Sequence, residues 1–232
     1  MSKHLTRDLE DLHRKVMGMA ARVEDAVYGA LKALQTRDPM TARTVLAGDE
    51  AIDRLENAIY EECLRLIALH QPVAIDLRQI ATTFMVTTDL ERMGDLAVDI
   101  AERAEALAGL PTILGDAAAD ALSAKLQRMT DIATGMVRQV LDAFVSMDGP
   151  LARRVIRTDA EVDRYHAEII RDVIARMQKS PDAVEAGLSL FSAVRHLERI
   201  ADHATNIAED VIYLVEGETV RHRPDAVTRS EP

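Results

Sequence analysis

Apolar residues recur every three or four positions along almost the whole chain, and no stretch alternates as a half-buried strand would. Proline, glycine and short polar runs divide this pattern into six segments. The expected helices cover about 5–36, 39–70, the stretch from after Pro72 to about 108, 116–147, 151–179 and 181–217. Pro39 and Pro181 lie at or near first turns, where proline is favoured, and Ser180 is the expected N-cap of the last helix. The pattern predicts an all-α protein.

The last three segments repeat the first three. DEAIDRLENAI (49–59) precedes DAEVDRYHAEI (159–169) by 110 positions, and LERMGD (90–95) precedes LERIAD (197–202) by 107 positions. Short connections make consecutive helices antiparallel. We therefore expect two tandem, internally duplicated three-helix bundles of six long antiparallel helices. They are expected to cover 1–110 and 115–217, with GLPTILGD (109–116) between them and a disordered polar tail over 218–232.

The composition narrows the class of protein. A formal net charge of −11 argues against non-specific nucleic-acid binding, which depends on Lys and Arg neutralising phosphates. No stretch free of Asp, Glu, Lys and Arg exceeds ten residues, well short of the roughly 20 that a membrane-spanning helix needs. The one cysteine, Cys63, lies on a predicted apolar face and is expected to be buried and unreactive. We expect a cytoplasmic protein without an integral membrane segment.

Acidic residues recur four positions apart near the end of each half. LERMGDLAVDIAE (90–102) and LERIADHATNIAE (197–209) agree at eight of thirteen positions, and both place acids on the side of the helix away from its apolar stripe. The preceding helix in each half adds a second acid-x-x-x-acid pair. Like charges at this spacing cost a few tenths of a kcal/mol per pair, so their repetition calls for a reason. The candidate metal ligands are Asp49, Asp53, Glu91 and Asp95 in the first half and Asp159, Asp163, Glu198 and Asp202 in the second.

Two interpretations of these acids stay open. If neighbouring helices pack side by side, four carboxylates gather at an exposed edge in each half, where they repel unless a cation or protons join them. Oxygen-only ligation suits Mg, Mn, Fe or Ca better than structural zinc. His166, one turn after Asp163, could assist a metal, and Glu56 takes that place in the first half. A carboxylate face opposite an apolar stripe is, however, ordinarily a solvated helix surface.

No catalytic arrangement is visible. The chain has no Gly-rich phosphate loop, no Ser/His/Asp set and no Cys/His arrangement. A di-iron carboxylate core needs two E-x-x-H elements, and only EDLH (10–13) fits. His196 and His203 have no histidine counterpart in the first half and are expected at the surface. The residues therefore favour a non-enzymatic protein, with a structural helical protein or a metal-buffering protein as the alternatives.

The two L-E-R-x-x-D-x-A-x-x-I-A-E segments, each preceded by D-x-x-x-D on the helix before, resemble the PhoU family of bacterial phosphate regulators. The resemblance extends to about residue 216 and implies two similar three-helix bundles. It also implies that the eight candidate acids bind metal ions or small metal clusters, with Fe, Mn, Zn or Mg as the candidate metals. One departure is that Asp99 stands where Asn206 matches the family, so the two sites are expected to differ in affinity or metal count.

The resemblance also implies a role and partners. Members of this family damp the phosphate-starvation response when phosphate is plentiful. They are thought to link the ATPase subunit of a phosphate ABC transporter to a membrane sensor histidine kinase. They are peripheral, cytoplasmic and often dimeric. For this chain the resemblance therefore predicts a negative regulator of phosphate transport that acts as an adaptor and forms a homodimer.

Overall fold

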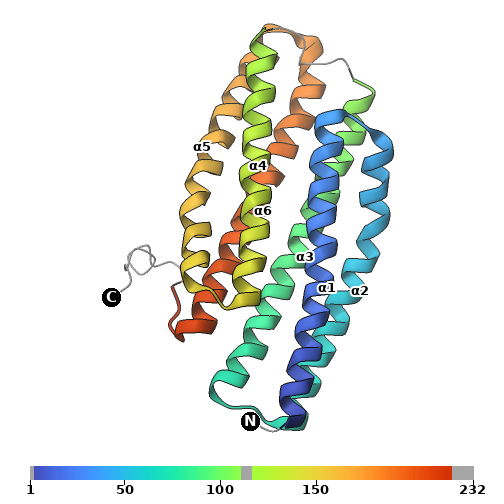
Figure 1. Ribbon diagram of the computed structural model, residues 1–232. Coiled ribbons are helices and arrows are strands. Elements are labelled where there is room, and N and C mark those ends of the chain that lie inside the picture. Colours follow the sequence, from blue (N-terminus) through green and yellow to red (C-terminus); the bar gives the residue numbers. More distant parts are fainter. Residues whose placement is uncertain (1–2, 111–116, 221–232) are drawn as a thin grey trace.

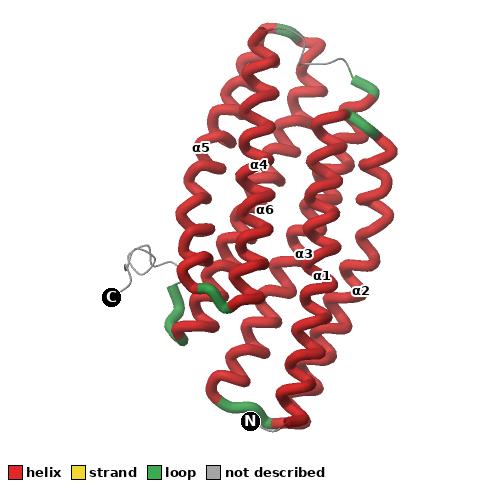
Figure 2. Tube along the Cα trace, viewed as in Figure 1, coloured by secondary structure: helices red, strands yellow, loops and turns green. Residues whose placement is uncertain are grey.

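The computed structural model describes residues 3–110 and 117–220, and this part of the chain contains six long helices and no strand (Figures 1 and 2). The helices are α1 (Lys3–Thr36), α2 (Pro39–His70), α3 (Ala74–Ala108), α4 (Ala117–Ser146), α5 (Gly149–Lys179) and α6 (Val184–Glu216). The six predicted segments are confirmed to within a few residues. Most of GLPTILGD and the tail from residue 221 onward lie outside the described residues.

The helix starts show the duplication in atomic detail. The Asp38 side chain caps α2 by accepting hydrogen bonds from the backbone N–H groups of Met40 and Thr41, and Asp148 caps α5 by accepting from Leu151. Each cap satisfies donors that the first turn leaves unpaired. The prediction for Ser180 was wrong, because its side chain makes no capping bond and a 3-10 turn, η1 (Pro181–Ala183), precedes α6.

The two bundles lie side by side along most of their length, α1–α3 on the right of Figure 1 and α4–α6 on the left. The contact between α3 and α6 is the most extensive of all helix pairs, and α1 also touches α4. Both central helices are therefore covered on several sides. None of the helices in the described ranges contains an apolar stretch of the length that a membrane span requires.

The predicted apolar stripes form the centre of one continuous core. Every stripe residue is at most 3% exposed: Leu90, Met93, Ala97, Ile100, Ala104 and Leu107 on α3, and Leu197, Ile200, Ala204, Ile207, Val211 and Leu214 on α6. Cys63 is buried as predicted, and burial raises the pKa of its thiol to about 12, so it stays protonated at neutral pH. The sequence pattern thus identified the core correctly.

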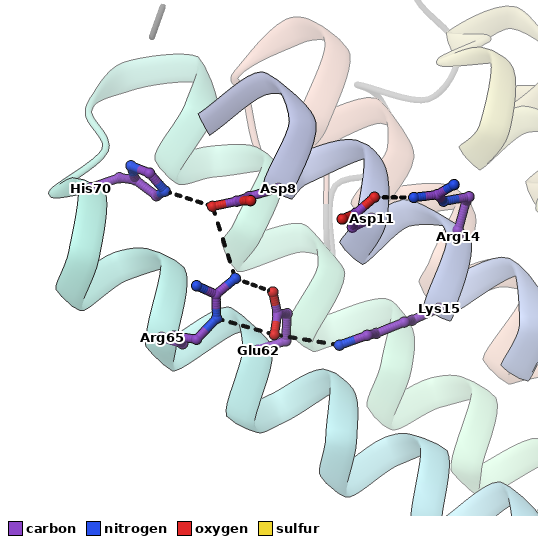
Figure 3. Close-up of polar contacts among 7 residues, drawn as sticks. All are labelled: Asp8, Asp11, Arg14, Lys15, Glu62, Arg65 and His70. Atoms are coloured by element: carbon purple, nitrogen blue, oxygen red, sulfur yellow. Dashed lines mark hydrogen bonds and ion pairs between the residues drawn. The ribbon is translucent and has the colours of Figure 1, made fainter. Parts of the chain in front are cut away.

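Charged side chains join the first turns of α1 to the last turns of α2 (Figure 3). His70 Nε2 lies 2.9 Å from Asp8 Oδ2, and Lys15 Nζ donates to Glu62 Oε2 at 3.3 Å. Arg65 contacts both acids, with its Nε 3.2 Å from Glu62. The hydrogen bond from His70 is the main reason that the pKa of Asp8 lies below its usual value. These contacts fix α1 against α2 at this end of the bundle.

Candidate metal centres

Two polar contacts set the register of α2 against α3. Arg43 Nε donates to Glu105 Oε1 at 2.8 Å, and the hydroxyls of Tyr60 and Thr88 form a short hydrogen bond. In antiparallel helices these contacts bring the segment around Asp53 level with the segment around Asp95. The two acid-x-x-x-acid pairs of the first half therefore face each other.

Three of the four predicted ligands of the first half meet. One carboxylate oxygen from each of Asp49, Asp53 and Asp95 lies within 4.8 Å of the other two. Glu91 lies one turn before Asp95 on α3, and its pKa is raised by burial and then by the charge of Asp95. Arg92 is the nearest counter-charge, at 3.4 Å from Asp95 Oδ2 and 3.5 Å from Glu91 Oε2.

These acids are held in an unfavourable electrostatic state. Burial raises the pKa of Asp49, with Asp53 and Asp95 adding to the effect, and burial likewise raises that of Asp95. Asp49 Oδ1 is buried and has no hydrogen-bond partner in the described residues. Buried polar atoms in native proteins are nearly always satisfied, so this oxygen calls for an explanation. A hard cation fits an oxygen-only donor set that contains such an atom.

The second half holds its acids differently. Burial, together with the charges of Asp163, Asp202 and Glu198, raises the pKa of Asp159 to about 6, against a hydrogen bond from Thr205 that lowers it. Glu198 and Asp202 also have raised pKa values, again mainly through burial. Within 3–110 and 117–220, however, no three of these groups come as close together as the first-half acids. The acids of the second half thus also repel one another, but their carboxylates lie farther apart than those of Asp49, Asp53 and Asp95.

The prediction of an exposed carboxylate edge holds for Asp163 and Asp202 but needs correction for three other acids. Glu91, Asp95 and Asp159 are half-buried rather than exposed. The reason is that Glu91 and Asp95 lie where α2 packs on α3, and Asp159 lies where α5 packs on α6, so the neighbouring helix covers part of each side chain. A single stripe on a helical wheel indicates one buried face and says nothing of a second.

The surface placement of two histidines was also wrong. His203 Nδ1 lies 2.7 Å from Asp89 Oδ1, and His196 Nδ1 lies 3.6 Å from Asp99 Oδ2, so both histidines connect α6 to α3. Burial lowers the pKa of His196, and the charge of Asp99 opposes this effect. Because α6 lies against α3, residues with no partner in their own half find one in the other.

Asp89 was missed by the sequence reasoning. Only 8% of it is exposed, and its Oδ1 accepts hydrogen bonds from His203 and from Asn206 Nδ2, the latter at 3.2 Å. Asp99 and its second-half counterpart Asn206 thus both contact residues of the other half. The charge of Asp99 also raises the pKa of Asp95. The one available signal was an acid directly before the apolar residue Leu90.

Replacing Asp159 with Asn should stabilise the metal-free protein. The pKa of Asp159 rises from 3.8 to about 6 on folding, so the native state binds more protons than the unfolded chain between these values. The contribution of Asp159 to the free energy of unfolding therefore falls as the pH rises from 3.8 to about 6, and it is constant at higher pH. The variant should gain on the order of 1 kcal/mol at pH 7.5, after allowance for solvent screening, and lose part of the pH dependence. Denaturant unfolding at pH 5 and 7.5 measures both, and an unchanged pH dependence would contradict the assignment.

Comparison with known proteins finds one domain family matched twice, once in each half of the chain. The family model described as "PhoU domain" matches residues 16–104 and again residues 126–211. The chain is 37% identical over 222 residues to a Pseudomonas putida protein named phosphate-specific transport system accessory protein PhoU homolog, covering 96% of this chain and 84% of that one. It is 38% identical to the Aquifex aeolicus homolog, covering 94% and 96%.

Two solved structures share the fold. The crystal structure of PhoU from Pseudomonas aeruginosa superposes with a TM-score of 0.85 at 37% identity, covering 92% of this chain and 99% of that one. The phosphate transport system regulatory protein PhoU from Streptococcus pneumoniae gives a TM-score of 0.83 at 28% identity, covering 93% and 99%. The agreement extends over both bundles.

Proposed function

The chain belongs to the PhoU family, and we propose that it is a non-enzymatic regulatory adaptor of phosphate transport whose carboxylate centres bind metal ions. Its curated relatives are named accessory proteins of the phosphate-specific transport system. Two observations carry the metal-binding part: the Asp49, Asp53 and Asp95 carboxylates meet, and Asp49 Oδ1 is buried without a hydrogen-bond partner in the described residues. The alternative of a purely solvated acidic face does not account for that oxygen.

The centres have assigned residues. Asp49 and Asp53 from α2 with Glu91 and Asp95 from α3 form the first centre, and Asp159 and Asp163 from α5 with Glu198 and Asp202 from α6 form the second. A bound cation supplies positive charge that offsets the repulsion among these acids. The residues themselves position oxygen donors from two helices, so occupancy links α2 to α3 and α5 to α6.

The proposed partners are those of a phosphate-signalling system. The adaptor contacts the ATPase subunit of a phosphate ABC transporter and a sensor histidine kinase from the cytoplasmic side, as a homodimer, and it keeps the starvation response low when phosphate is plentiful. Long helices such as α2 and α5 provide extended surfaces for such contacts. The relatives' names support the link to transport.

Elemental analysis of the purified protein tests the metal centres. We expect at least about one metal ion per half in the wild type. A variant with Glu91, Asp95, Glu198 and Asp202 all changed to Ala should contain none and still fold. The matched control changes four exposed acids, Glu50, Glu61, Glu102 and Glu161, and should keep its metal. Wild type that stays empty after incubation with iron, manganese and zinc would leave the acids as a solvated face.

Deletion of the gene in its host tests the adaptor role. We expect phosphate uptake and starvation-response reporters to stay active in high phosphate, and the wild-type gene supplied in trans to restore repression. The variant without the four ligand acids shows whether repression needs the metal. Normal repression in the deletion strain would contradict the adaptor role, and metal binding without this phenotype would favour a metal-buffering protein.

A further inference from the structure

We propose that the two centres select different metals, the first taking hard cations through oxygen alone and the second taking borderline transition metals with His166 as a nitrogen ligand. This inference rests on the proposed metal-binding function and adds a division of roles between the halves. The two centres occupy equivalent places in the duplicated fold, so a difference in donor atoms is a difference in selectivity.

The packing of α5 on α6 places His166 opposite Glu198. A Cβ atom added at Gly187 of α6 would lie 2.6 Å from Met177 Cγ, so these two residues are in direct contact. His166 lies eleven residues before Met177, and Glu198 lies eleven residues after Gly187. In antiparallel helices equal steps in opposite directions reach the same level, and eleven residues are close to three full turns. His166 and Glu198 therefore face each other as Met177 and Gly187 do.

His166 also shares its helix face with the other ligands of α5. At about 100° per residue, Asp159, Asp163 and His166 fall within roughly 60° of one another. On α6, Glu198 and Asp202 are one turn apart. The imidazole is half-buried, as Asp159 is, so it lies against the neighbouring helix and not out in solvent. The five side chains thus line one seam between α5 and α6.

Glu56 takes the corresponding place in the first half. It lies one turn before Tyr60, whose hydroxyl bonds to Thr88, and Glu91 lies one turn after Thr88. The antiparallel register therefore puts Glu56 opposite Glu91, as His166 is opposite Glu198. The first seam offers carboxylate oxygens at every one of these positions, whereas the second replaces one carboxylate with an imidazole.

The charges of His166 and Glu56 shift the pKa values of the neighbouring acids in opposite directions. His166 lowers the pKa of both Glu198 and Asp202, partly offsetting the burial that raises them. Glu56 instead raises the pKa of Glu91. Each residue therefore lies within electrostatic range of its own centre, which agrees with the register of the helices.

Metal preference follows from donor chemistry. A site of carboxylate oxygens alone suits Mg, Mn or Ca, and a mixed site with one imidazole favours Zn, Co, Ni or ferrous iron. The first centre has three of its carboxylates already close together, and the second is more open in the same structure. The second-half carboxylates lie farther apart, so a bound metal has to draw them together. A transition metal gains a stronger bond from the His166 imidazole than from a carboxylate, and this bond favours that movement.

The experiment measures each centre separately with Zn²⁺ and Mn²⁺ as probes. Asp159→Ala/Asp163→Ala protein keeps the first centre, and Asp49→Ala/Asp53→Ala protein keeps the second. Isothermal titration gives the ratio of Zn²⁺ to Mn²⁺ affinity at each centre. We expect this ratio to be at least about ten-fold larger at the second centre, on the scale that ligand-sphere changes usually produce. Zinc X-ray absorption should show one nitrogen ligand there.

Exchanging Glu56 and His166 tests whether the imidazole causes the difference in metal preference. His166→Glu should bring the ratio of the second centre down to that of the first and remove the nitrogen from the absorption spectrum. Glu56→His should raise the ratio of the first centre. His4→Gln, at an exposed histidine, is the control and should change neither. Equal ratios at both centres, or a ratio unaffected by His166→Glu, would overturn the inference and leave metal binding standing. Absence of binding at both centres would overturn the proposed metal function itself.

Discussion

Leu90→Asp should abolish folding of the chain. Leu90 is completely buried on the face of α3 that forms the centre of the core. Losing a leucine side chain from such a site costs about 2–5 kcal/mol, and burying a carboxylate in its place adds several more. The total is comparable with the whole stability of a typical domain, roughly 5–15 kcal/mol. Far-UV circular dichroism should show little helix at 25 °C and no cooperative thermal transition.

Two further variants make this prediction specific. Leu197→Asp changes the equivalent residue of α6, which is also completely buried, and should have an effect of the same size. Leu69→Asp places the same charge on a helix where the side chain is 62% exposed, and it should fold with a nearly unchanged thermal midpoint. A folded Leu90→Asp protein would mean that this face of α3 is not part of the core.

The helices and the core could be predicted because each depends on local information. A helix ends where proline or a capping residue makes it end, as at Asp38 and Pro39, and the apolar stripe of α3 identifies one buried face. The duplication strengthened the assignment, since two independent segments gave the same pattern. Ser180 shows the limit, because a favourable capping residue competes there with a 3-10 turn.

The seam between the halves could not be predicted in the same way. Thr82, Thr87 and Asp89 are polar residues that the structure buries, so they add nothing to an apolar stripe. The burial of Asp89 follows from the contact of α3 with α6, and that contact depends on how one bundle is placed on the other. Sequence spacing carries no signal for such a placement, which is why His196 and His203 were expected at the surface.

The acids of the candidate centres were predictable as a set but not in their geometry. Repeated four-residue spacing placed Asp49 and Asp53 on one helix and Asp95 on the next, and these three do meet. The corresponding acids of the second half do not come as close together, although their spacing is the same. The difference depends on side-chain positions and on neighbours such as Thr205, which the spacing of acids leaves undetermined.

Asp89→Ala should weaken the union of the two bundles by about 2–4 kcal/mol. The change leaves the half-buried His203 Nδ1 and Asn206 Nδ2 without their shared acceptor, and a polar group that loses its partner away from solvent costs about 1–3 kcal/mol. Denaturant unfolding measures the loss, and hydrogen exchange should show faster exchange in α3 and α6 than in α2 and α5. A loss below ~0.5 kcal/mol, typical of a surface change, would contradict the assignment.

The duplicated sequence supplies a matched variant for testing the Asp89–His203 pair. Leu96 is the first-half counterpart of His203, so His203→Leu introduces a residue that the fold already accepts at the equivalent place. If the two side chains stabilise the seam through each other, the double variant Asp89→Ala/His203→Leu should cost less than the sum of the single variants. Asp99→Ala removes the longer 3.6 Å contact to His196, where Asp99 is also more exposed, and should cost less than Asp89→Ala. Equal costs for Asp89→Ala and Asp99→Ala would mean that burial of Asp89 adds nothing, and strictly additive losses would mean that it acts independently of His203.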